Sequence, residues 1–167
     1  TDYLDLMNLA LSRCEYNDIF VEVGVFVGES LARLVDESKK YNKKISINAV
    51  DLFGFGDLLA NKQNKLDVPK MNAPTLEWTK PEDGNEVFIK FRDFLRQGDR
   101  FKDLNSIIIS DANNAATLFG DKSIFFCFID AGHSYDDVFS NLCSWYPKMK
   151  HGGILGGHDY ISGLQIK

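Results

Sequence analysis

The chain has 167 residues, 44% of them hydrophobic and 26% charged, and a formal net charge of −5. This length and composition predict a single globular domain over residues 1–167. The negative charge argues against a nucleic-acid partner, because such proteins carry a basic footprint. No apolar run approaches the ~20 residues of a membrane span, and three cysteines are too few for a disulfide framework. We therefore expect a cytoplasmic protein that binds neither nucleic acid nor membrane.

The chain opens with a predicted helix over residues 3–14 and a buried strand from Ile19 that ends in a glycine turn. The turn reads Glu22-Val-Gly24-Val-Phe26-Val-Gly28, and a second helix follows it, as in the ligand sites of α/β proteins. A dinucleotide fingerprint needs a glycine where Phe26 stands, so that backbone can approach a diphosphate. A ligand with an amino-acid end fits better, because Glu22 can pair with its ammonium group. The alternative is a turn whose glycines serve packing alone.

A second strand is predicted over residues 45–51, and it ends in Asp51. An acid at this position accepts hydrogen bonds from ribose hydroxyls in nucleotide-binding α/β units, although it can also be a simple loop cap. Periodicity then disappears over residues 52–81, where glycine and proline recur. A connection of that length predicts a lid or a substrate-facing insertion, and disorder is the alternative.

The rest of the chain alternates predicted helices and buried strands. A helix over about 83–100 precedes a strand at 107–109, which closes on Ser110-Asp111-Ala112. A strand over 124–129 ends at Asp130, a helix runs from Ser134 to Pro147, and a short strand over 154–157 delivers His158-Asp159. Such alternation predicts an α/β fold with a parallel sheet and right-handed crossovers.

Polar or acidic residues therefore follow every predicted strand. The carboxyl ends of parallel strands meet at one edge of the sheet, where open α/β folds bind ligands. If the last two strands are neighbours, one pocket gathers Asp130, His133, His158 and Asp159. Carboxylates suit a divalent cation, and a histidine suits a general base. The alternative is that both histidines only cap backbone groups in loops.

These segments together resemble the class I S-adenosylmethionine-dependent methyltransferases over nearly the whole chain. The resemblance rests on the glycine turn, Ala49-Val-Asp51, Ser110-Asp111-Ala112, Phe128-Ile-Asp130-Ala-Gly-His133-Ser-Tyr135 and Gly152-Gly-Ile-Leu-Gly-Gly-His158-Asp159-Tyr160. The sequence is similar to small-molecule O-methyltransferases, including metal-dependent enzymes that methylate macrolide sugars, and to the cephalosporin-hydroxylase-like group. The resemblance implies a Rossmann-like fold with strand order 3-2-1-4-5 and helices on both faces. We expect the family's terminal hairpin to be missing from these residues, or the sheet to be completed otherwise.

The resemblance also implies an activity, which is methyl transfer from S-adenosylmethionine to a hydroxyl of a sugar or other small molecule. His133 is then the general base, with Asp130 beside it. A divalent cation would be held by Asp130, His158 and Asp159, although His158 replaces an acid of the usual pair and leaves room for a softer metal than magnesium, or none. The cofactor would contact Glu22, Gly24, Gly28, Ser30, Asp51, Leu52, Asp111, Ala112 and Asp130.

Two other functions stay open at this point. The chain could be a non-catalytic module that binds S-adenosylmethionine or another nucleoside. It could also be an NAD-type Rossmann oxidoreductase, which Phe26 disfavours. The resemblance leaves a homo-oligomer open.

Overall fold

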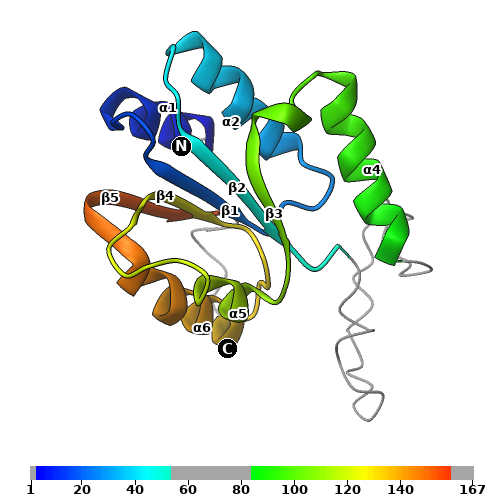
Figure 1. Ribbon diagram of the computed structural model, residues 1–167. Coiled ribbons are helices and arrows are strands. Elements are labelled where there is room, and N and C mark those ends of the chain that lie inside the picture. Colours follow the sequence, from blue (N-terminus) through cyan, green and yellow to red (C-terminus); the bar gives the residue numbers. More distant parts are fainter. Residues whose placement is uncertain (1–2, 54–83, 159–167) are drawn as a thin grey trace.

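A computed structural model describes residues 3–53 and 84–158 of the chain (Figure 1). Helices and strands alternate along these residues, as the sequence predicts. The helices are α1 (Tyr3–Arg13), α2 (Glu29–Lys40), α4 (Gly84–Gln97), α5 (Ala112–Ala116) and α6 (Tyr135–Trp145). The strands are β1 (Ile19–Val23), β2 (Ser46–Asp51), β3 (Leu104–Ile109), β4 (Ile124–Ile129) and β5 (Met149–Gly157), and two short 3-10 turns cover Phe101–Asp103 and Tyr146–Lys148.

The five strands form one sheet in the order β3-β2-β1-β4-β5, and all four pairings are parallel. This confirms the predicted order. β1 lies at the centre, and all six residues of β4 beside it are buried. A strand covered on both faces needs apolar side chains at every position, which is why these strands read as continuous apolar runs.

Helices cover both faces of the sheet, which also confirms the prediction. α1, α2 and α4 lie on one side of it, and α5 and α6 lie on the other (Figure 1). Each side has its own apolar core. Phe20, Phe126 and Phe128 belong to the core under α1, α2 and α4, whereas Trp145 anchors the core under α5 and α6.

The structure extends two of the predicted strands. β3 starts at Leu104. β5 starts at Met149, so Gly152 and Gly153 lie inside this strand. On β4, Ile124 pairs with Met149 and Phe126 pairs with Ile154, so the glycine pair forms an irregularity in the ladder. The short strand expected over 154–157 is therefore the second part of a longer strand.

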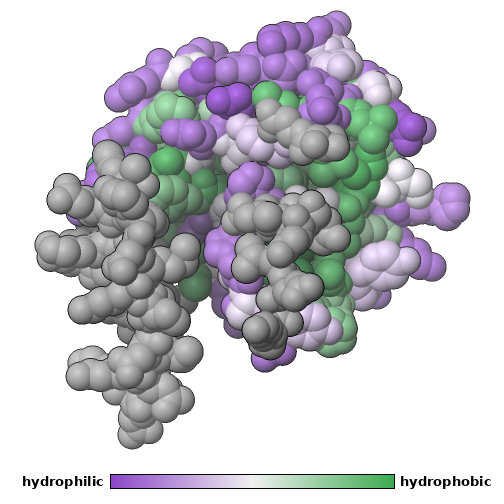
Figure 2. Space-filling model, turned by 180° about the vertical axis from the view of Figure 1, so that it is seen from behind, coloured by the Kyte–Doolittle hydropathy of each residue, from purple (hydrophilic) through white to green (hydrophobic). Residues whose placement is uncertain are grey.

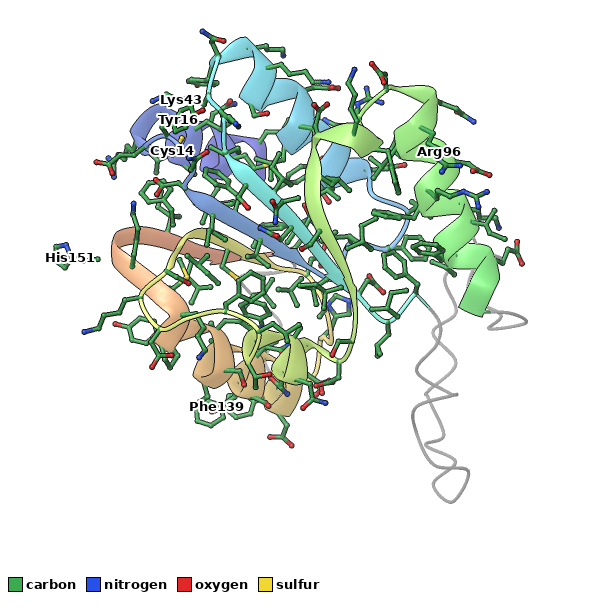
Figure 3. All side chains as sticks on the ribbon, viewed as in Figure 1. Cys14, Tyr16, Lys43, Arg96, Phe139 and His151 are labelled. Carbon is green, nitrogen blue, oxygen red and sulfur yellow. The ribbon has the colours of Figure 1, made fainter. Side chains whose placement is uncertain are left out.

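α6 buries only part of its side chains. Val138 and Leu142 are each 42% exposed, whereas Trp145 and Asn141 are buried. The indole nitrogen of Trp145 donates to the carbonyl of Ala112 at 3.1 Å, which turns α6 toward α5. The apolar flank of α6 therefore faces away from the core, and Figure 3 shows Phe139 pointing away from the sheet.

Seen from behind, hydrophobic residues gather along one side of the molecule, whereas hydrophilic residues cover its upper end (Figure 2). Within the described ranges, no helix has the length and apolar character needed to span a membrane. The predicted insertion at 52–81 lies outside the described residues apart from its first two positions, so its role as a lid stays a prediction.

Candidate active site

A cleft of about 700 Å³ opens at the carboxyl ends of the strands. Its walls come from segments that follow β1, β2, β3, β4 and β5, together with the first turns of α5 and α6. It therefore lies where open α/β sheets bind their ligands. The structure brings together eight of the residues predicted from the sequence, which are Gly24, Asp51, Leu52, Asp111, Ala112, Asp130, His133 and His158.

Gly24 holds the turn after β1 against the end of β4. Its φ of 88° lies in the region that favours glycine. A Cβ there would overlap the backbone carbonyl of Asp130. The amide of Gly24 donates to the carbonyl of Val50 at 2.8 Å, and the amide of Asp130 donates to that of Val23 at 2.7 Å. The floor of the cleft is thus backbone from three adjacent strands in close contact.

Asp51 ties two loops together through its carboxylate. One oxygen accepts from the amide of Phe26 at 2.7 Å, and the other accepts from the amide of Phe53 at 2.6 Å. Asp51 therefore does cap loop backbone, as one of the two expectations from the sequence had it. A carboxylate oxygen can accept a second hydrogen bond, so these contacts leave capacity for ribose hydroxyls, and that contact stays a prediction.

Glu22 lies beneath the turn and is fully buried, so it does not line the cleft. Burial raises the pKa of Glu22 to about 8. A hydrogen bond from the Ser30 hydroxyl opposes the shift, and the negative charges of Asp130 and Asp51 add to it. Its second oxygen, Oε2, has no hydrogen-bond partner among the described residues. The site thus contains a buried acid that is protonated at neutral pH.

Gly28 and Ser30 also lie away from the cleft lining. Gly28 precedes α2 with φ 87°, and the ring of Phe91 would be 2.9 Å from a Cβ at this position. Ser30 serves Glu22 through the hydrogen bond already described. In the described structure, both residues shape and support the turn.

His158 and Asp130 meet at the other end of the cleft, with 3.7 Å between His158 Nδ1 and Asp130 Oδ2. His133 lines the same cleft and is exposed. Asp159 lies outside the described residues. Within the described part of the chain, no three His, Cys, Asp or Glu side chains cluster as a metal site would require, so the metal prediction rests on a residue that the structure does not describe. The third histidine, His151, points away from the sheet (Figure 3).

The structure adds lining residues that sequence reasoning missed, namely Phe26, Asn113, Asp137 and Asn141 among others. Asp111 caps α5 by accepting from the amides of Asn113 and Asn114 at 3.0 and 3.2 Å. Ser134 caps α6 by accepting from the amide of Asp137. The segment Ser134-x-x-Asp137 has the form of a capping box, which marks the start of a helix.

Residues 21–160 match the family model Methyltransf_24, described as a methyltransferase domain. The chain belongs to this family of S-adenosylmethionine-dependent methyltransferases. That membership decides against an NAD-type oxidoreductase. No curated protein matches the chain significantly.

Solved methyltransferase structures share the fold. One is an rRNA methylase from Streptococcus thermophilus, at 13% identity and a TM-score of 0.56, with 96% of this chain and 74% of that chain covered. SMU.1697c from Streptococcus mutans, classed as a methyltransferase and solved with S-adenosylhomocysteine (SAH), has 13% identity, a TM-score of 0.54 and coverage of 93% and 70%. The calicheamicin methyltransferase CalS11 has 15% identity, a TM-score of 0.56 and coverage of 92% and 61%.

The residues of the cleft fit the methyl donor of this family. S-adenosylmethionine carries a positive sulfonium and an ammonium group. Four aspartates line the cleft, namely Asp51, Asp111, Asp130 and Asp137. Among the described residues, no lysine or arginine lines it. A cleft lined by one sign of charge attracts the opposite charge. The cleft thus suits a cation and repels a diphosphate.

Proposed function

We propose that this methyltransferase transfers the methyl group of S-adenosylmethionine to a hydroxyl of a small molecule, such as a sugar or another natural product. The observation that carries the proposal is that His133 and Asp130 line the same acidic cleft as Asp51 and Gly24. A base and a nucleoside-type site in one cleft are what this reaction needs.

The proposed cofactor contacts follow from these positions. Asp51 receives the ribose hydroxyls, and backbone near Gly24 faces the amino-acid end. Asp111 and Ala112 lie at the adenine, together with Leu52. Glu22 serves the ammonium group from below the turn, by supporting the backbone that faces it, and its oxygen Oε2 has no hydrogen-bond partner among the described residues. Gly28 and Ser30 contribute by holding that turn.

Bound S-adenosylmethionine supplies an electrophilic methyl group. The chain supplies a base, because an imidazole nitrogen of His133 removes the proton from the acceptor hydroxyl. General-base removal of a proton typically contributes about 10²–10⁴-fold to a rate. Asp130 is the second proposed catalytic residue, and its carboxylate lies near the imidazole of His158.

A divalent cation is the second part of the proposal. Asp130 and His158 are adjacent, and Asp159 would be the third ligand. A metal at this position would lower the pKa of the acceptor hydroxyl. The mixed nitrogen and oxygen donors suit a transition metal as well as magnesium.

The choice of a small acceptor rests on charge. The structural neighbours include enzymes named for calicheamicin and for rRNA, so the shared fold leaves the acceptor open. The acidic lining of this cleft and the net charge of −5 both disfavour binding of an RNA phosphate backbone. They therefore favour an uncharged or cationic small molecule as the acceptor.

Transfer of labelled methyl to a panel of hydroxylated small molecules tests the proposal. His133→Ala should lower turnover by about 10²–10⁴-fold with cofactor affinity nearly intact, whereas the matched control His151→Ala should leave turnover unchanged. A chelator should mimic the loss if a metal takes part. Turnover that a chelator does not affect rejects the metal alone, and S-adenosylmethionine binding with no transfer to any acceptor points to a non-catalytic module.

A further inference from the structure

A second hollow, of about 750 Å³, opens at the amino ends of β2 and β3. Its walls come from residues within 38–47, which lead from α2 into β2, from 102–105 at the start of β3, and from Tyr16 after α1. The candidate active site lies at the carboxyl ends of the same strands, and the two openings share no lining residue. The second hollow is therefore a separate site.

The lining of this hollow is basic, and we call it the basic hollow. One carboxylate lines it, that of Asp103, together with four lysines, which are Lys39, Lys43, Lys44 and Lys102. The candidate active site is instead lined by four aspartates, and the whole chain carries a net charge of −5. A hollow with an excess of one charge concentrates ions of the opposite sign. The basic hollow therefore attracts anions.

Two of the four lysines are already paired with carboxylates. Lys39 Nζ lies 2.8 Å from Asp103 Oδ2, and Lys102 forms an ion pair with Asp99. Their charges are largely neutralised within the protein, so the net positive charge of the basic hollow comes from its other two lysines.

Lys43 and Lys44 carry this uncompensated charge. The ammonium group of Lys43 donates to the backbone carbonyl of Cys14 at 2.9 Å, and that of Lys44 lies 5.6 Å from the ring centroid of Tyr16. Figure 3 shows Lys43, Tyr16 and Cys14 close together. Within the described part of the chain, neither ammonium group pairs with a carboxylate. Because an ammonium group has three donors, both lysines keep donors for a ligand.

An aromatic ring and apolar side chains adjoin these two cations. Tyr16 is 68% exposed, and Ile45, Ile47 and Leu104 also line the hollow. An exposed ring offers a flat apolar face to a planar ligand group. The volume is within the range of small-molecule sites. The basic hollow thus combines charge with apolar contact, as a site for an organic anion requires.

We propose that the basic hollow binds a small phosphomonoester, with its phosphate on Lys43 and Lys44 and its organic part against Tyr16. A phosphomonoester carries a charge of about −1.5 to −2 at pH 7, which matches two ammonium groups, whereas a carboxylate would neutralise only one. Lysine is also a common ligand of phosphate. The inference is independent of the proposed function, because it concerns the opposite end of the sheet.

Calorimetric titration of phenyl phosphate into wild type and into the double variant Lys43→Gln, Lys44→Gln tests the proposal. This probe combines a phosphomonoester with one ring and has no nucleoside, so it does not resemble the methyl donor. Wild type should bind one phenyl phosphate per chain. The Kd should rise at least about tenfold in the double variant, because the charge-assisted contacts of both lysines are lost.

The matched control is the double variant Lys122→Gln, Lys148→Gln. It lowers the net charge by the same amount outside the basic hollow, so its Kd should equal that of wild type. If the loss of the contact with Cys14 impairs folding of the first double variant, Lys44→Gln alone keeps the test decisive. Lys44 makes no hydrogen bond to the described residues, and its substitution should raise the Kd several-fold.

A competition experiment separates the basic hollow from the candidate active site. Saturation with SAH should leave the affinity for phenyl phosphate unchanged. Four results overturn the inference: no binding to wild type, an unchanged Kd after substitution of Lys43 and Lys44, an equal loss in the two double variants, or competition by SAH.

Discussion

Glu22 shows at the scale of a single residue how burial changes chemistry. Its side chain is fully buried in the central strand, and burial raises its pKa from an ordinary value near 4.5 to about 8. The unfolded chain releases the proton near pH 4.5, while the folded chain keeps it up to about pH 8. Folding is therefore favoured by this group below the lower value, and that contribution is lost as the pH rises through the upper value.

We predict that Glu22→Gln removes this pH dependence. The wild-type free energy of unfolding, relative to the variant, should fall by several kcal/mol between about pH 4.5 and about pH 8. Urea denaturation of both proteins at a series of pH values measures the difference, in which the other titrating groups cancel. Parallel stability curves across that range would show that Glu22 is ionised in the folded protein.

At the scale of elements, the turn between β1 and α2 is the part of the fold that shapes the site. Gly24 has φ 88° and no room for a Cβ beside Asp130, whereas Gly152 in β5 has φ 78° and open space around it. Both glycines have a left-handed backbone, but only Gly24 has a neighbouring group where a Cβ would be. Comparing substitutions at the two positions therefore separates the cost of backbone strain from the cost of steric overlap.

We predict that Gly152→Ala costs about 1–2 kcal/mol, the usual cost of a left-handed alanine. Gly24→Ala should cost several kcal/mol more, because its neighbour is backbone and cannot move aside. Chemical denaturation of the two variants measures both costs. Equal losses would mean that the turn relaxes away from β4, and that Gly24 does not fix the floor of the cleft.

The sequence predicts best those elements whose residues are all buried alike. β4 is buried on both faces, so the apolar run Ile124–Ile129 is recognisable as a buried strand. α6 is harder to predict, because apolar residues occupy its outward flank as well as its core side: Tyr135, Val138, Phe139 and Leu142 are all exposed. Periodicity locates such a helix, but only packing against α5 decides which side is buried.

At the scale of the whole molecule, parallel topology makes the candidate site predictable in part. Acids at the strand ends must share one edge of a parallel sheet, and Asp51, Asp111 and Asp130 do line one cleft. The burial of each strand-end acid was not predictable from the sequence: Glu22 was expected in the cleft, but it lies fully buried under the turn. Phe26 and Asn141 were missed as lining residues because their positions depend on loop conformation and helix rotation, which spacing does not encode.

The central claim is that the strand-end cleft is an S-adenosylmethionine site built around Asp51. Calorimetric titration of SAH into wild type and Asp51→Asn tests it most directly, because asparagine can still accept one of the two amide hydrogen bonds but loses the charge. Wild type should bind one SAH per chain and no NAD, and Asp51→Asn should weaken SAH binding at least about tenfold through the loss of charge-assisted hydrogen bonds. Absence of SAH binding by wild type, or equal affinity in the two proteins, would contradict the account.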